Sequence, residues 1–261
     1  MLTEVKGLVI RTVNLSDNDK LLTIFTEEYG KITAVANGSR VLKSRYLAAA
    51  QLFCYGSYVL YKKGDRYWVR EVTLIESFFD LRADLTRTAL AAYVCDVADD
   101  VVEENAPDKE LLRLVLNILY ATASGQYPLP KIKAAFEMRA ACILGFMPML
   151  DGCHYCGKTE GDFFLDIMNG VVLCTECHRN GQGIDVPLNT SDIRTSRIIC
   201  PLSASALAAL YYTAVCPLQR LLSFRLDEAD MPAFSSSAEK YLLNHLERGF
   251  KSLDFYKQVC D

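Results

Sequence analysis

Four cysteines are the residues of this 261-residue sequence whose types and spacing most directly suggest chemistry. They form two Cys-x-x-Cys pairs, Cys153 with Cys156 and Cys174 with Cys177, separated by seventeen residues. A Cys-x-x-Cys turn presents two thiolates to one metal ion, and two turns at this separation are typical of four-cysteine zinc sites. A catalytic zinc keeps one coordination position open, whereas four thiolates close the shell. We therefore expect one structural Zn²⁺ bound by these four residues.

Structural thiols without a metal, reduced or oxidised, are the alternative for this cluster. A second, weaker alternative is that the two pairs are redox-active. It is weaker because neither pair opens a helix after a strand, as a thioredoxin-like motif does. His154 and His178 adjoin the pairs and could replace a thiolate, but they break the regular spacing. Since the sequence has ten cysteines and we expect no secretory signal or membrane span, we predict a reducing, cytoplasmic location.

The segment before residue 80 has the pattern of β-structure. Short apolar or alternating runs rich in Val, Ile and Thr predict strands over 5–14, 20–27 and 30–38. Residues 51–78 predict a long hairpin that turns at Lys63-Gly64-Asp65. Five strands in about 75 residues favour a small closed barrel of the OB-fold type. An SH3-like barrel is the structural alternative that periodicity leaves open.

Apolar residues recur at helical spacing after about residue 81. The expected helices span 84–105, 108–125, 130–146, 203–215 and 235–250, the last of them capped by serine. The fold class we predict is α+β, with an OB-fold β-barrel domain over residues 1–80 and an α-helical domain over 81–261. A four-cysteine zinc knuckle is inserted into the helical domain at about residues 150–182.

Basic side chains gather at two places in the front segment. Residues 1–80 carry eleven Lys and Arg against nine Asp and Glu, whereas residues 81–261 carry seventeen against twenty-three. Guanidinium and ammonium groups beside small hydroxyls suit phosphate oxygens, so both places are candidate DNA contacts. The loop over 37–46 contributes Arg40, Lys43 and Arg45, and the predicted hairpin turn contributes Lys62, Lys63, Arg66 and Arg70.

Aromatic residues alternate with the cations of the predicted hairpin. Tyr61, Tyr67 and Trp68 could stack on bases while the cations follow the backbone of a single strand. For Trp68 we favour the alternative that the ring fills the barrel core. For the loop that begins at Arg40 we favour phosphate binding over a solvated surface.

Several stretches, taken in order, resemble the RecO family of bacterial recombination mediators and DNA repair proteins. They are "GLVIRTVNLSDNDKLLTIFTEEYGKITAVANGSRVLKS", "FEMRAACILGFMPMLDGCHYCG", "GVVLCTEC" and "YLLNHLERGFKSLDF". The resemblance covers essentially the whole chain. The family's loop usually reads closer to Gly-Ala-Arg-Arg, where this chain has Gly38-Ser39-Arg40-Val41 and therefore one basic residue fewer. The second cysteine pair is commonly preceded by Gly-Gly, where this chain has Asn169-Gly170.

The resemblance implies a protein without enzymatic activity. Such proteins bind single- and double-stranded DNA, anneal complementary strands and, with RecR, help to load RecA onto DNA coated by the single-stranded DNA-binding protein, SSB. The acidic, apolar C-terminal tail of SSB recruits them. On one predicted helix Lys131, Lys133 and Arg139 are candidates to bind that tail, and a solvated face is the alternative.

Two rival functions stay open beside the DNA mediator. An enzyme is disfavoured, because the sequence lacks Ser-x-x-Lys, Gly-x-Ser-x-Gly, His-Glu-x-x-His and the phosphate-binding Gly-x-x-x-x-Gly-Lys. Its three histidines also leave few candidates for acid–base chemistry. A zinc-dependent module that binds protein without contacting DNA directly is the second rival. A steep salt dependence of DNA binding would separate the mediator from both.

Overall fold

The computed structural model describes residues 2–41, 43–44, 46–64, 66–181 and 197–260. The chain divides into two compact units, the first formed by residues 1–126 with 250–261 and the second by residues 127–249. The first unit contains the barrel and three helices. The predicted boundary at about residue 80 follows the last barrel strand, and its role as a limit between separately folding domains stays a prediction.

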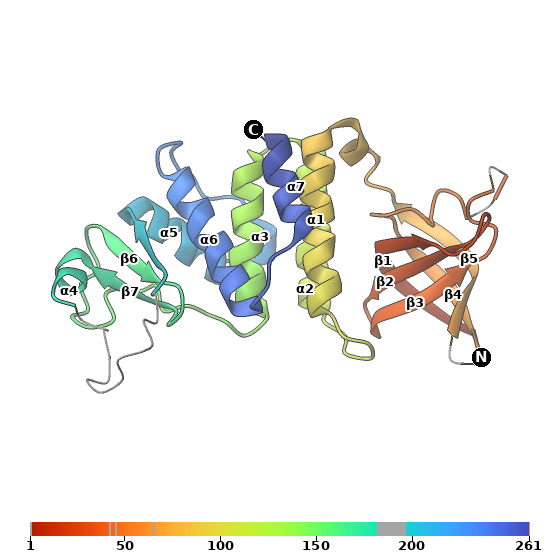
Figure 1. The fold of residues 1–261 in the computed structure, drawn as a ribbon, viewed down its shortest axis with the longest axis horizontal. Helices are drawn as coiled ribbons and strands as arrows, with labels where there is room; N and C mark the ends of the chain where they lie inside the picture. The colour runs from red at the N-terminus through yellow and green to blue at the C-terminus, as the bar shows by residue number, and fades with distance from the viewer. Residues whose placement is uncertain (1, 42, 45, 65, 182–196, 261) are drawn as a thin grey trace. The chain divides into compact units, whose positions relative to one another are not determined.

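The barrel consists of five strands in the first unit (Figure 1). They are β1 (Leu2–Asn14), β2 (Lys20–Thr26), β3 (Gly30–Ala36), β4 (Tyr55–Lys63) and β5 (Arg66–Glu76). Their order around the closed barrel is β1-β2-β3-β5-β4, and β3 pairs with β5 in parallel. A five-stranded barrel with this Greek-key order is an OB-fold, so the predicted fold class is confirmed.

Alternate side chains of the strands fill the barrel. Because successive residues of a strand point to opposite faces, one set of positions is buried and the other is in contact with solvent or with the helices. The buried strand residues that pack together are Val5, Val9, Leu22, Ile24, Ile32, Ala34, Ala36, Tyr58, Leu60 and Val69, with Ala50 added from the connection between β3 and β4. Trp68 is absent from this set and is only partly buried. The favoured assignment of Trp68 to the barrel core is therefore wrong.

Three helices complete the first unit: α1 (Leu85–Val101), α2 (Lys109–Ser124) and α7 (Lys251–Cys260). A short 3₁₀ turn, η1 (Phe79–Ala83), leads from the barrel to α1. Aspartates cap both α1 and α2, because Asp84 accepts a hydrogen bond from the Arg87 N–H and Asp108 from the Leu111 N–H. The Tyr93 ring meets Phe250 edge-on at 5.8 Å. In the described part of the chain, no helix combines the length and apolarity that a membrane span requires.

The barrel contacts the connection between α1 and α2 at the turn that begins β3. The Lys31 N–H donates to the Glu103 carbonyl, and the Asn105 N–H donates to the Tyr29 carbonyl. Gly30, which lies between these contacts, has a φ of +63°, and a Cβ there would lie 2.3 Å from the Glu103 carbonyl oxygen. Only glycine allows the two backbones to approach so closely.

The second unit combines helices with a small sheet. Its helices are α3 (Leu129–Ile143), α4 (Thr175–Arg179), α5 (Ala204–Val215) and α6 (Met231–Leu246), with the 3₁₀ turn η2 (Leu218–Arg220). Its strands are β6 (Phe163–Asp166), β7 (Val171–Cys174) and β8 (Ile199–Leu202), in the order β7-β6-β8. The antiparallel strands β6 and β7 form a hairpin between the two cysteine pairs.

A buried ion pair links α3 to α6. Lys133 Nζ lies 2.7 Å from Glu239 Oε2 and 2.9 Å from Glu137 Oε1, and the side chains of Lys133 and Glu137 are almost completely buried. Burial acts to lower the pKa of Lys133, but the two carboxylates raise it above its ordinary value. The ammonium therefore stays charged inside the unit.

The last predicted helix differs from the structure at both ends. It begins at Met231 rather than at the serines, because Pro232 occupies a favoured position in its first turn. It ends at Leu246, where Glu247 adopts a left-handed conformation with φ of 53°. Residues 251–260 then form α7 as a separate helix, which the sequence did not predict.

Gly30→Ala should destabilise the first unit strongly, because the new Cβ would meet two backbone carbonyls. Gly64→Ala is the matched control, since Gly64 has a φ of +60° but no atom within 4 Å of its added Cβ. The control should lose only about 1–2 kcal/mol, the cost of a left-handed conformation in a residue with a side chain. Thermal unfolding of both variants measures the difference. Equal losses of stability in the two variants would mean that the close backbone approach at Gly30 has no effect on the free energy of unfolding.

Candidate metal centre and nucleic-acid interface

The four cysteines reach one point from three elements of the second unit. Cys153 and Cys156 lie in the loop that follows α3, where Cys153 accepts a backbone hydrogen bond from the Gly157 N–H and forms a tight turn. Cys174 ends β7, and Cys177 lies in the first turn of α4. Antiparallel pairing of β6 with β7 carries Cys174 back to the first pair, which makes the hairpin the scaffold of the cluster.

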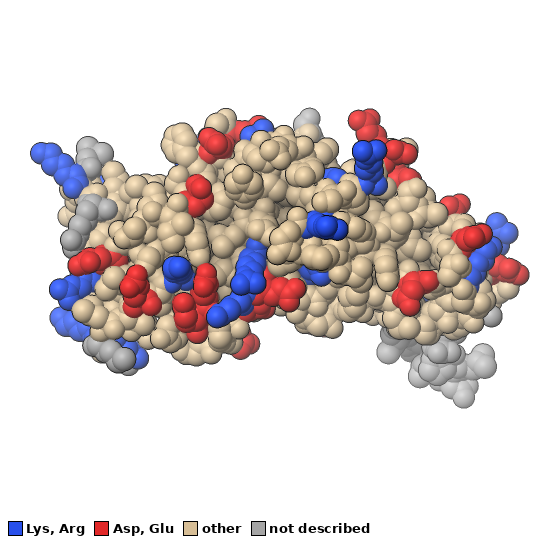
Figure 2. Space-filling view, turned by 180° about the vertical axis from the view of Figure 1, so that it is seen from behind, with Lys and Arg blue, Asp and Glu red and all other residues tan. Residues whose placement is uncertain are grey.

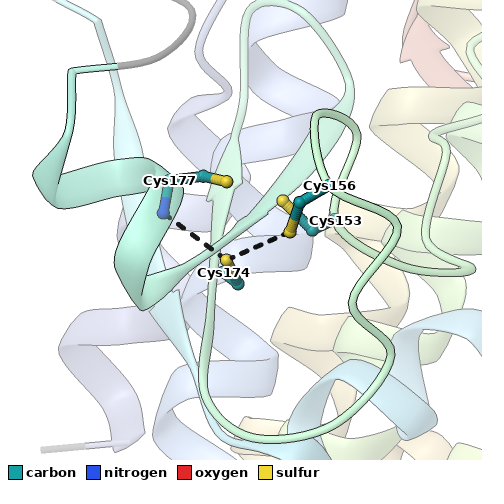
Figure 3. A group of neighbouring side chains, drawn as sticks. All are labelled: Cys153, Cys156, Cys174 and Cys177. Atoms are coloured by element: carbon teal, nitrogen blue, oxygen red, sulfur yellow. Dashed lines mark hydrogen bonds between the residues drawn. The ribbon is translucent and has the colours of Figure 1, made fainter.

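The four Sγ atoms lie within 4.8 Å of one another and point toward a common centre (Figure 3). Cys156 Sγ and Cys174 Sγ are 3.6 Å apart, and the Cys177 N–H donates to Cys174 Sγ at 3.5 Å. Zn–S bonds of about 2.3 Å in a tetrahedron place the sulfur atoms roughly 3.8 Å apart. The arrangement can therefore hold one metal ion with little movement of the side chains.

The chemical state of the thiols also suits a cation. Burial acts to raise the pKa of Cys153, but hydrogen bonds from backbone N–H groups, including that of Cys174, lower it to about 6. Burial raises the pKa of Cys177. Neighbouring thiolates repel one another, and a bound cation would balance their charge. The described cysteines form no disulfide.

The two neighbouring histidines lie outside the cluster of possible ligands. His178 stacks on Phe164 at 4.1 Å between ring centroids, and His154 meets Tyr155 edge-on at 5.1 Å. Among the described residues, the group that could bind a metal contains the four cysteines and no histidine. The regular spacing of the four cysteines, which the histidines would break, agrees with this geometry.

The first group of candidate DNA contacts lies in the loop after β3. Arg40 is exposed and donates from Nη1 to the Ser16 carbonyl at 2.6 Å, while its N–H donates to the Asn18 carbonyl. The loop is fixed further by Asp19, whose Oδ1 accepts from the Gly38 N–H at 2.7 Å. Lys43 is exposed, and Arg45 lies outside the described residues. Other N–H groups of the Arg40 guanidinium can therefore donate to a ligand. The loop that carries Arg40 is held in place by these backbone and side-chain hydrogen bonds.

The second group lies on the hairpin of β4 and β5. Lys62, Lys63, Arg66 and Arg70 are all exposed. The Arg70 guanidinium lies 4.0 Å from the Glu71 carboxylate. On the face drawn in Figure 2, Lys and Arg side chains are interspersed with Asp and Glu. Binding of a polyanion must then rely on local groups of cations.

One such local group lines a cavity of about 320 Å³ between the hairpin, β2 and β3. Its cations are Lys31, Lys62 and Arg66, and its rings are Tyr29 and Tyr67. The remaining lining residues are Leu15, Leu21, Ile32, Thr33, Val35, Glu104 and Asn105. An OB-fold binds oligonucleotides on the face of its second and third strands and in the loops beside it, which is where this cavity lies.

Sequence reasoning missed Lys31, Tyr29 and the two residues from the connection between α1 and α2. Lys31 is in an ion pair with Asp99 at 3.3 Å, which holds its ammonium at the edge of the cavity. An outward-facing position on the third strand could have indicated Lys31. No local sequence pattern indicated that Glu104 and Asn105 would line the cavity, because tertiary packing places them there.

Trp68 stacks on Tyr61 outside the barrel core. Their ring centroids are 6.4 Å apart with an angle of 19° between planes, as expected for residues paired directly across two antiparallel strands. Trp68 Nε1 is buried and has no acceptor among the described residues. The hairpin therefore presents an aromatic pair together with its cations.

The three α3 cations predicted as tail contacts are all buried and partnered. Besides the Lys133 ion pair, Lys131 Nζ donates to the Phe224 carbonyl and lies 4.3 Å from the Phe224 ring. Arg139 donates to the carbonyls of Ala214 and Cys216. They do not form the solvated face that was the alternative, and their part in binding a tail stays a prediction.

Comparison with known proteins covers both units. The family model described as "Recombination protein O N terminal" matches residues 1–78, and the one described as "Recombination protein O C terminal" matches residues 82–254. Three similar relatives share the name DNA repair protein RecO. They come from Acetivibrio thermocellus, Alkaliphilus metalliredigens and Caldanaerobacter subterraneus subsp. tengcongensis.

The A. thermocellus relative is 33% identical over 98% of this chain and 96% of its own length. The A. metalliredigens relative is 29% identical over 99% and 100%, and the C. subterraneus relative 26% identical over 99% and 98%. Together the two family models account for nearly every residue of the sequence. The chain belongs to the RecO family of DNA repair proteins.

Proposed function

We propose that this chain is a non-enzymatic mediator of recombination that binds single- and double-stranded DNA and anneals complementary strands. The observation that carries the proposal is the cavity beside β3, where three cations and two tyrosines meet on the ligand face of an OB-fold. Cations neutralise phosphates and rings stack on bases, while the Watson–Crick edges stay available for pairing. Annealing of this kind needs no nucleotide hydrolysis.

The partners we propose follow from family membership. With RecR, the chain would help to load RecA onto single strands coated by SSB. It would act in the bacterial cytoplasm and associate with the nucleoid when bound to DNA. The alternative function is a zinc-dependent protein-interaction module that does not bind DNA directly.

For the SSB tail, we propose contacts with the cations of α3, and among them Lys131 would have to exchange its buried hydrogen bond to the Phe224 carbonyl for a carboxylate of the tail. Lys133 is already paired with two carboxylates, whereas Lys131 has no carboxylate partner among the described residues. The rings of Phe224 and Tyr127 lie 4.3 and 5.3 Å from Lys131 Nζ and offer an apolar surface beside the charge. The larger apolar cavity nearby, of about 590 Å³, includes Glu228 and Glu239, which would repel an acidic tail.

The metal we propose is a single structural Zn²⁺ bound by Cys153, Cys156, Cys174 and Cys177. Four thiolates select zinc over harder cations and leave no open position for substrate. The bound ion would supply folding free energy to a small sheet whose three strands have only four residues each.

Elemental analysis of reduced, freshly purified protein should find one zinc per chain. Cys177→Ser should lower this ratio well below one and reduce the thermal stability of the second unit, because three thiolates hold the ion weakly. Cys260→Ser, at an exposed cysteine outside the cluster, should change neither value. Wild-type protein without any metal would contradict the assignment.

Replacing Arg40, Lys43 and Arg45 by alanine should weaken binding to single-stranded DNA and flatten its salt dependence. Each lost phosphate contact lowers the slope of log K against log salt by roughly 0.7, so the slope should fall by up to about 2. Alanine at the exposed helix residues Lys109, Arg113 and Lys240 removes the same charge away from the barrel and is the control. An unchanged slope would place the contact on the hairpin instead.

The same titration tests the proposed function itself. DNA binding by the wild-type chain that weakens steeply with salt would support the mediator. Absence of binding at low salt would favour the protein-interaction module. A requirement for ATP in annealing by the isolated chain would contradict a non-enzymatic role.

A further inference from the structure

The connection between α1 and α2 adds a carboxylate and an amide to a cavity whose charged residues are otherwise cations. Glu104 and Asn105 line the cavity beside β3 together with Lys31, Lys62 and Arg66. A carboxylate repels phosphate but accepts hydrogen bonds from N–H donors. Glu104 therefore suits a different part of a nucleotide from the part that the cations suit.

The backbone of this connection is fixed to the start of β3. Glu104 forms an isolated antiparallel bridge with Gly30, and the Asn105 N–H donates to the Tyr29 carbonyl at 2.9 Å. Both contacts use backbone atoms, and both Glu104 and Asn105 are exposed. The two side chains are thus held at the cavity and are accessible to a ligand there.

The charge of Lys31 is balanced by a residue that does not line the cavity. Lys31 Nζ lies 3.3 Å from Asp99 Oδ1, and Asp99 Oδ2 lies 3.3 Å from Arg11 Nη1. Lys62 and Arg66 are exposed and come from the hairpin of β4 and β5. These two hairpin residues are therefore the cations best suited to bind a phosphate in the cavity.

The acidic and basic groups reach the cavity at different points along β3. Gly30 contacts the connection, whereas Ala34 pairs with Tyr67, whose partner on β4 is Lys62. Four residues of strand separate the two contacts, a distance of about 13 Å. The cavity is therefore asymmetric, with a carboxylate toward one end and cations toward the other. A nucleotide has the same asymmetry, because its phosphate is an anion and its base carries N–H donors.

Guanine is the base whose edge best matches the carboxylate. Its N1–H and N2–H₂ groups are adjacent donors, and a carboxylate accepts two parallel N–H bonds. Adenine and cytosine present one amino group beside an acceptor, and thymine presents an N–H between two acceptors. The Asn105 amide can donate to guanine O6. Tyr29, which is 38% exposed and lines the cavity, offers a ring on which the base can stack.

We propose that the cavity beside β3 holds one guanine nucleotide of a single strand. Glu104 accepts from guanine N1–H and N2–H₂, and Lys62 and Arg66 contact the phosphate. The inference rests on the proposed function and deepens it, because it assigns a base preference to one position of the bound strand. The pairing edge of that one base is occupied, whereas the neighbouring bases keep theirs free for a complementary strand.

Thymidine oligonucleotides of about eight nucleotides, within the range that one OB-fold binds, test the base preference. The central base is guanine, hypoxanthine, adenine or thymine, and each oligonucleotide competes with a labelled long thymidine strand at low salt. Wild-type chain should bind the guanine oligonucleotide roughly five-fold or more tightly than the adenine one, as a good bidentate contact discriminates. Hypoxanthine, which lacks the N2 amino group, should fall between them.

Glu104→Gln and Glu103→Gln form a matched pair of variants. Both residues are exposed and the substitutions remove the same charge, but Glu103 does not line the cavity. Glu104→Gln should lose the preference for guanine and keep its affinity for the all-thymidine oligonucleotide, whereas Glu103→Gln should behave as wild type. Since Glu104 contacts Gly30 through its backbone, the variant should fold, and thermal unfolding checks this.

Equal affinity of wild-type chain for the guanine and adenine oligonucleotides would overturn the proposal while leaving DNA binding intact. A guanine preference that persists in Glu104→Gln, or that is lost equally in Glu103→Gln, would also overturn it, because the carboxylate would not be the group that reads the base. Wild-type chain that binds no long single strand would refute the proposed function as well. The failures of the two proposals are thus distinguishable.

Discussion

The barrel depends on a short parallel seam between β3 and β5. Only Ala34 with Tyr67 and Val35 with Trp68 are paired there among the described residues. Parallel pairing is slightly weaker per residue than antiparallel pairing, so the seam relies on the core packed behind it. The seam also places Tyr67 of β5 beside β3, where it lines the cavity. The Tyr61–Trp68 stack follows instead from the antiparallel pairing of β4 with β5.

A bulge in β5 modifies the hairpin further. Val59 pairs with Glu71 and Leu60 with Val69, so Arg70 is the extra residue. A bulge bends its strand and increases the local twist, which here lies just beyond the aromatic stack. The extra residue at this bulge is an exposed cation, whose guanidinium lies 4.0 Å from the Glu71 carboxylate.

Sequence patterns predicted the features that depend on local spacing. The cysteine pairs and the five barrel strands are of this kind, because turns and periodicity determine them locally. The face of Trp68 was predicted wrongly. A shift of one residue in the register moves a side chain to the opposite face, and the parallel seam that sets this register joins residues far apart in the chain. The burial of Lys133 could not be predicted from local patterns either, since its partner Glu239 comes from a helix that is distant in the sequence.

The helical connections show a second limit of local reasoning. Serines before an apolar run resemble a cap, yet Pro232 starts α6 earlier and the serines become part of the helix. Separation of α7 from α6 depends on the left-handed Glu247, a conformation that its residue type does not favour. Phe250, three residues later, packs edge-on against Tyr93 of α1 within the first unit.

That packing has a consequence for the order in which the chain folds during synthesis. Unit 1 is interrupted after residue 126 and resumes at residue 250, so all of unit 2 is translated between its two parts. Unit 2 can fold on the ribosome as soon as its own residues have emerged, whereas the helix layer of unit 1 must wait for α7. Until then the side of α1 that α7 covers is exposed, and a nascent chain stalled before residue 250 would present an apolar surface to chaperones.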